Sequence, residues 1–165
     1  MKKRQLNCHP EATIPYLLSK KMFIDLDHQE SIIRINLIIN AHPLKYICTD
    51  DQNENFFAGW ASLDWQGSIV ARREDKTRNR INKREIQLCA WRYLLTLILI
   101  LSEKKDLVSN LIKFLDAIPE DLIRYCFHRK LPNSRVKQVM AISGLKRQAV
   151  RHQMKKLEAN NDLQQ

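Results

Sequence analysis

The stretch from Val139 to Leu157 reads VMAISGLKRQAVRHQMKKL, and it contains one of the three glycines of the chain. Every Arg, Lys and His in it follows Gly144. Glycine adopts positive φ values at little cost, so Gly144 predicts a sharp reversal between two helices. We expect these helices at about 135–143 and at about 146–158.

The second of these helices is predicted to have two unlike sides. When its residues are placed about 100° apart, Val150, Met154 and Leu157 fall in one narrow apolar sector. The adjoining stripe and the positions beyond it are polar, and they hold Arg147, Arg151, Lys155, Gln148 and His152. One side of the helix therefore packs inward, and the other presents hydrogen-bond donors.

Positive charge is concentrated in the same third of the chain. The whole sequence has a formal net charge of +10 and a pI of about 9.6. No Asp or Glu occurs between Asp121 and Glu158, where ten basic residues lie: Arg124, Arg129, Lys130, Arg135, Lys137, Lys146, Arg147, Arg151, Lys155 and Lys156. A solvent-facing helix normally mixes charges of both signs, so a field of one sign favours an anionic partner.

A third helix precedes this pair. Pro119 stands where a proline is tolerated in a first turn, and Glu120 and Asp121 suit the positive end of the helix dipole. We expect this helix to end at about Lys130. Residues 118–158 are thus predicted to form a unit of three helices, followed by a tail at 159–165.

This unit resembles the helix-turn-helix of bacterial transcription regulators, and its turn and second helix most resemble those of the cyclic-AMP receptor protein family. The matching residues are Val139 and Met140 in the first helix, Gly144 in the turn, Leu145 after it, and Val150 in the second helix. The resemblance does not extend to the N-terminal two thirds of the chain.

Two residues depart from the pattern of that family. Ser143 stands where an apolar residue is usual, and Lys146 stands where a Ser, Thr or Asp usually caps the second helix.

The resemblance implies a role for each matching position. Arg147, Gln148 and Arg151 are expected to contact base edges in the major groove of double-stranded DNA, and Gly144 to form the turn. The expected phosphate contacts are Arg135, Lys137, Lys146, Lys155 and Lys156.

The residues before this unit predict a mainly α-helical fold. Apolar residues recur at steps of three and four within 82–102, and a second amphipathic helix is expected at about 107–118. The second half of the helix at 82–102 is apolar on nearly every side, which is typical of a central core helix or of a dimer interface. We predict a homodimer through 86–101 and assign 82–117 to a core and dimerisation region.

Residues 1–81 are predicted to form an N-terminal region that includes a basic connector at about 71–85. A helix is expected after Asp27, which suits an N-cap, and a strand remains the alternative because β-branched residues are frequent in "IIRINLII". The aromatic residues of 56–65 are expected to be core, the alternative being stacking on bases. A hairpin between Gly59 and Gly67 is a further possibility.

The sequence argues against several other classes of protein. The four cysteines form no Cys-x-x-Cys pair, and their spacing does not suit a structural zinc site. No phosphate-binding glycine loop and no His-Glu-x-x-His motif occur, so neither an enzyme nor a cofactor is expected. The apolar run 93–101 is too short to span a membrane, and no signal peptide is visible, so a cytoplasmic location is expected.

Sequence alone favours a sequence-specific DNA-binding regulator of bacterial, plasmid or phage origin. One alternative is an accessory protein of replication, partition or conjugation that binds nucleic acid with little specificity. Another is a basic helical adaptor that binds an acidic protein.

Overall fold

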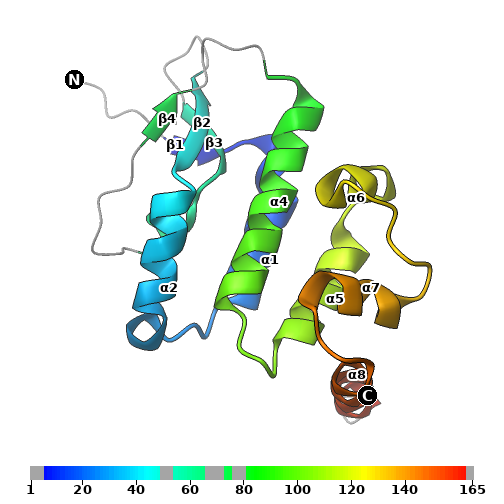
Figure 1. Ribbon diagram of the computed structural model, residues 1–165. Helices are drawn as coiled ribbons and strands as arrows, with labels where there is room; N and C mark the ends of the chain where they lie inside the picture. Colours follow the sequence, from blue (N-terminus) through cyan, green and yellow to red (C-terminus); the bar gives the residue numbers. More distant parts are fainter. Residues whose placement is uncertain (1–5, 49–53, 66–72, 76–80, 163–165) are drawn as a thin grey trace. The chain divides into compact units, whose positions relative to one another are not determined.

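The computed structural model describes residues 6–48, 54–65, 73–75 and 81–162. In these residues the chain forms eight α-helices, a short 3₁₀ helix and one small sheet, which confirms the predicted mainly α-helical fold (Figure 1). The chain divides into two compact units, Met1–Leu101 and Ser102–Gln165.

The sheet belongs to the first unit and was not predicted. Its strands are β1 (Leu6–Cys8), β2 (Leu44–Cys48), β3 (Glu54–Ala58) and β4 (Arg73–Asp75), in the order β1-β3-β2-β4. β2 and β3 are antiparallel, with Tyr46 opposite Phe56, whereas β1 pairs with β3 and β4 with β2 in parallel. β2 and β3 therefore form a hairpin. Between Gly59 and Gly67, where a hairpin was a further possibility, residues 61–64 form a helix, and Gly67 lies outside the described residues. β4 falls inside the stretch predicted as a basic connector.

Three helices of the first unit precede the long central one. α1 (Thr13–Met22) follows the 3₁₀ helix η1 (Pro10–Ala12), and α3 (Ala61–Asp64) follows β3. α2 (His28–Ala41) confirms the helical interpretation of that stretch. Its N-cap is Asp27, whose carboxylate accepts hydrogen bonds from the backbone N–H groups of residues 29 and 30, at 2.8 and 3.1 Å.

Helix α4 (Lys83–Leu101) forms the centre of the first unit. It begins with a reciprocal cap, in which the side chains of Asn82 and Glu85 each accept a hydrogen bond from the other's backbone N–H. α4 contacts η1, α1, α2 and β3, and Leu97 and Ile98 are fully buried. Most of the apolar residues of 86–101 therefore lie in the core, although Leu99 is 44% exposed, and a homodimer through 86–101 stays a prediction.

The aromatic residues after β2 confirm the core prediction. Phe57 and Trp60 are fully buried, and the rings of Trp60 and Tyr93 meet edge to face, with centroids 4.6 Å apart. The indole N–H of Trp60 donates to the hydroxyl of Ser19, at 3.0 Å. A buried indole needs such a partner, so this ring is fixed in the core.

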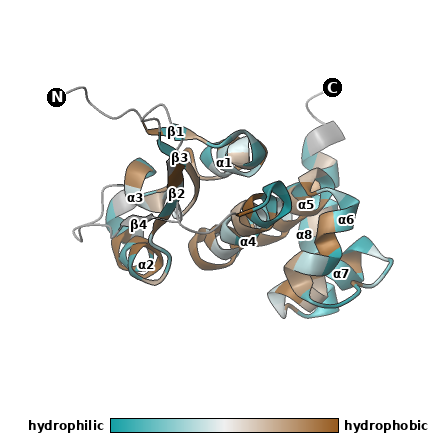
Figure 2. Cartoon of the chain, turned by 90° about the horizontal axis from the view of Figure 1, so that it is seen from above, coloured by the Kyte–Doolittle hydropathy of each residue, from teal (hydrophilic) through white to brown (hydrophobic). Residues whose placement is uncertain are grey.

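In the described part of the second unit, residues 102–162, the chain forms four helices. They are α5 (Leu107–Ala117), α6 (Glu120–Phe127), α7 (Arg135–Ser143) and α8 (Arg147–Asp162). Both α7 and α8 contact α5, and they contact one another. Their predicted positions agree with the structure to within a few residues, and α8 continues beyond the predicted end at Glu158. In Figure 2, α6 and α7 each have teal and brown portions, as amphipathic helices do.

The boundary between the units differs from the one predicted. The sequence predicts a core and dimerisation region at 82–117 and a DNA-binding unit that begins at residue 118. The structure divides after Leu101, because α5 places Val108, Leu111 and Phe114 in a buried core shared with α7 and α8. α5, α7 and α8 therefore pack on one another, and Phe127 of α6 meets Phe114 of α5 edge to face.

Among the described residues, no helix is both long and apolar enough to cross a membrane.

Candidate nucleic-acid interface

The turn between α7 and α8 depends on the backbone conformation of Gly144. This residue has φ of +71°, and its N–H donates to the carbonyl of Met140 at 2.9 Å. A Cβ atom added there would meet no heavy atom within 4 Å. Glycine is therefore favoured for its positive φ and not for lack of space.

Ser143, which departs from the family pattern, takes part in the same turn. Its hydroxyl donates to the carbonyl of Val139 at 2.7 Å and accepts from the backbone N–H of Leu145 at 3.1 Å. These bonds join the last turn of α7 to the segment that leads into α8. A polar residue thus stabilises the reversal where the pattern places an apolar one.

The inner side of α8 is anchored as the helical spacing predicts. Val150 is fully buried, and Met154 and Leu157 are partly buried. On the same side the amide of Gln153 donates to the backbone carbonyl of Lys104, at 3.0 Å. α8 is therefore attached both to the core and to the segment before α5, which fixes its rotation about its own axis.

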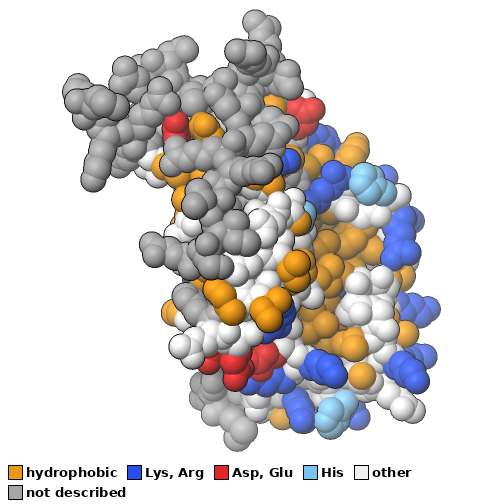
Figure 3. Space-filling view, turned by 60° about the vertical axis from the view of Figure 1, so that its left-hand side comes forward, with side chains coloured by type: hydrophobic (Ala, Val, Ile, Leu, Met, Phe, Trp, Pro, Cys, Tyr) orange, Lys and Arg blue, Asp and Glu red, His pale blue; other side chains and the backbone are white. Residues whose placement is uncertain are grey.

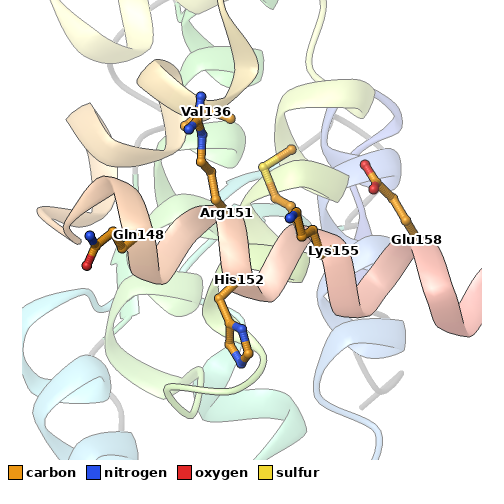
Figure 4. A pocket seen from close by; sticks show the side chains of 7 residues that line it. Val136, Gln148, Arg151, His152, Lys155 and Glu158 are labelled. Atoms are coloured by element: carbon orange, nitrogen blue, oxygen red, sulfur yellow. The ribbon is translucent and has the colours of Figure 1, made fainter.

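We define the outer face of α8 as Gln148, Arg151, His152 and Lys155, which are all exposed. These four side chains line a pocket of about 490 Å³ together with residues 136, 154 and 158. Figure 4 shows that the side chain of Arg151 extends toward Val136 of α7, whereas His152 points to the opposite side of the helix. The outer face thus presents hydrogen-bond donors on both sides of the exposed part of α8, with Arg151 on the side of α7 and His152 on the other.

Most of the predicted contact residues are accessible. Arg147, Lys137, Lys146 and Lys156 are exposed, as are the predicted members of the outer face. Arg147 does not line the pocket, because it lies at the edge of the outer face in the first turn of α8.

Arg135 differs from the other predicted phosphate contacts. It is partly buried, and its guanidinium forms an ion pair with Asp116 of α5 and donates to the side-chain oxygen of Gln138 at 2.9 Å. These partners hold Arg135 across α5 and α7. Its charge is partly neutralised within the protein, and the sequence could not indicate this because Asp116 is distant along the chain.

His152 was not among the predicted contacts, although the structure places it on the outer face. The signal was present in the sequence, since His152 follows Gln148 by one helical turn. The predicted contacts instead favoured the neighbouring stripe that holds Arg147 and Arg151.

The start of α8 is electrostatically unusual. Helix N-termini favour acidic residues, and α6 follows this rule with Glu120 and Asp121 in its first turn. α8 has no acidic residue in its first turn; it begins at Arg147, which Lys146 immediately precedes, and both of these residues are exposed. Two cations at the positive end of a helix dipole destabilise it slightly, and a bound anion would reverse that effect.

A polar cluster outside this interface connects two helices of the first unit. In the first unit, the hydroxyl of Tyr16 donates to Asp64 at 3.1 Å, and Lys20 pairs with the same carboxylate at 3.4 Å. Burial raises the pKa of Asp64, and the two partners partly offset this. The cluster joins α1 to α3. No group of three His, Cys, Asp or Glu residues suited to a metal ion occurs in the part of the chain that the structure describes.

Comparison of the sequence with protein-family models, and of the chain with curated proteins and solved structures, found no match.

Proposed function

We propose that this chain is a sequence-specific transcription regulator that binds double-stranded DNA through the outer face of α8. The observation that carries the proposal is the combination of a rigid anchor and an exposed polar ridge. Val150 and Gln153 fix the inner side of α8, while Gln148, Arg151 and Lys155 face solvent. The resemblance of 139–157 to a helix-turn-helix supports the same conclusion.

The proposed contacts follow from the chemistry of each side chain. Arg147 and Arg151 suit the two acceptors of guanine, and Gln148 suits the donor and acceptor of adenine. Lys137, Lys146, Lys155 and Lys156 suit phosphates, which set position rather than sequence. Arg135 would contribute less, because Asp116 already neutralises part of its charge.

Selection of bound duplexes from a random pool tests the proposal. We expect a recovered consensus, and we expect its affinity to exceed that of random duplexes by at least about a thousandfold at one salt concentration. Recovery of no consensus, with an affinity that falls steeply as salt is raised, would favour the low-specificity accessory protein. No measurable affinity for DNA at low salt would favour an acidic protein partner.

A further inference from the structure

The pocket on the outer face of α8 has an apolar floor and a polar rim. Val136 of α7 and Met154 of α8 line it and are partly buried. The polar lining residues Gln148, Arg151 and Lys155 are exposed. The two apolar side chains therefore lie deeper than the donors. Figure 4 shows Arg151 extending from α8 toward Val136, so that a donor and an apolar group adjoin.

Basic and apolar side chains also adjoin elsewhere on the surface. On the face that Figure 3 presents, Lys and Arg side chains in blue border apolar ones in orange, at the right of the view. Such neighbours are ordinary, because scattered apolar residues are common on protein surfaces. The pocket differs in that its apolar groups come from two helices and lie in a hollow of about 490 Å³.

The composition of the pocket suits the edge of a base better than a phosphate. Among the described residues that line it, Glu158 alone is acidic, and Figure 4 shows it at the opposite end from Gln148. A carboxylate repels a phosphate, and an apolar floor makes no hydrogen bond with one. A base edge carries no net charge, and its acceptors suit the donors on the rim.

One group in the major groove of DNA matches an apolar floor. Every base pair presents hydrogen-bonding groups there, and thymine alone among the four bases adds a methyl group. Hydrogen-bond donors cannot detect this methyl group, because it neither donates nor accepts. An apolar contact removes both the methyl group and the floor from water, and the hydrophobic effect makes this favourable.

We propose that Val136 and Met154 bind the methyl group of a thymine in the major groove. This inference rests on the proposed function and adds a second base to the one that Arg151 contacts. Because Arg151 extends toward Val136, the thymine and the guanine are neighbours in the bound sequence. Val136 stands between Arg135 and Lys137, the predicted phosphate contacts of α7, so that α7 also contributes to specificity.

Replacement of thymine by deoxyuridine tests the proposal, because it removes the methyl group and leaves every hydrogen-bonding group in place. Each thymine of the selected duplex is replaced in turn, together with its symmetry mate if the sequence is a palindrome. Fluorescence anisotropy at one salt concentration measures the affinity. We expect one thymine position to respond, with an affinity about threefold to tenfold lower, and the others to tolerate the change.

Variants of the floor show whether the pocket causes this preference. Val136→Ala should reduce the preference for thymine over uracil to less than about twofold, because it withdraws apolar surface from the floor. Ile142→Val also shortens a partly buried side chain of α7, but outside the lining, and should keep the full preference. If circular dichroism shows that the alanine variant is unfolded, Val136→Thr keeps the shape and introduces a hydroxyl, with the same loss expected.

The possible outcomes separate this proposal from the proposed function. A selected sequence without thymine, or one in which every thymine tolerates uracil, overturns the methyl contact alone. A preference that Val136→Ala and Val136→Thr leave unchanged does the same. Selection that recovers no consensus overturns the proposed function, and the methyl contact with it.

Discussion

Helices α4 and α8 are the two long helices of the chain, and their surroundings differ in kind. α4 has 19 residues and contacts η1, α1, α2 and β3, and most of its apolar residues are buried. α8 has 16 residues, of which Val150 is fully buried while the outer face stays in solvent. The comparison shows that helical periodicity identifies an inner side, but the rest of the fold decides whether the other sides find partners within the chain.

The same contrast applies to Gly59 and Gly144, the two glycines that the structure describes, which both have positive φ. A Cβ on Gly59 would lie 2.2 Å from the carbonyl oxygen of Pro43, whereas one on Gly144 would meet nothing within 4 Å. We expect Gly59→Ala to lower the free energy of unfolding by about 3–5 kcal/mol, because backbone strain adds to a clash with backbone. Gly144→Ala should cost about 1–2 kcal/mol, from strain alone. Urea denaturation followed by circular dichroism measures both, and equal losses would contradict the distinction.

Two leucines on α4 test whether this helix forms the core of its unit. Leu97 is fully buried, and Leu99 is 44% exposed. We expect Leu97→Ala to lower the free energy of unfolding by about 2–5 kcal/mol, because it removes buried methyl groups and leaves a cavity. Leu99→Ala, an identical chemical change on the same helix, should cost less than about 1 kcal/mol. The reverse order in denaturant titrations would show that the other side of α4 is the buried one.

The ion pair between Asp116 and Arg135 lies in the same unit as α8, and breaking it is expected to have a smaller effect on stability than the substitutions above. Asp116→Asn removes an exposed partner, so the free energy of unfolding should change by less than about 1 kcal/mol. DNA affinity at low salt should rise, because the unit loses a negative charge and Arg135 gains freedom to contact phosphate. Fluorescence anisotropy with a labelled duplex measures this rise, and a fall in affinity would place Asp116 in the interface instead.

How much the sequence predicted depended on whether the relevant contacts were local. The helix after Asp27, the turn at Gly144 and the inner side of α8 follow from spacing within a few residues, and the structure confirms them. The sheet was missed, because its strands are short and β1 pairs with β3 across more than forty residues. The unit boundary was misplaced for a similar reason: α5 is amphipathic in sequence, but only the fold shows that it packs on α7 and α8.

The candidate interface was predicted in the same uneven way. Gln148, Arg151 and Lys155 lie together on an exposed ridge, as helical spacing predicted. Arg135 was predicted to contact phosphate. Its ion pair with Asp116 could not be predicted, because Asp116 lies on another helix and is not near Arg135 in the sequence. The two hydrogen bonds of the Ser143 hydroxyl could not be predicted either. A family pattern gives the residue type that is usual at a position, but it does not say which other residue types can stabilise the same turn.

We propose that the outer face of α8, rather than the positive charge of the unit as a whole, recognises DNA. The most direct measurement compares Arg151→Ala with Arg124→Ala, an equal loss of charge at an exposed residue of α6, on the selected duplex and on a random one at the same salt concentration. We expect Arg151→Ala to lose about 1–3 kcal/mol of binding free energy on the selected duplex and less on the random one, with a small and equal effect of Arg124→Ala on both. Equal losses for the two variants on both duplexes would contradict the claim.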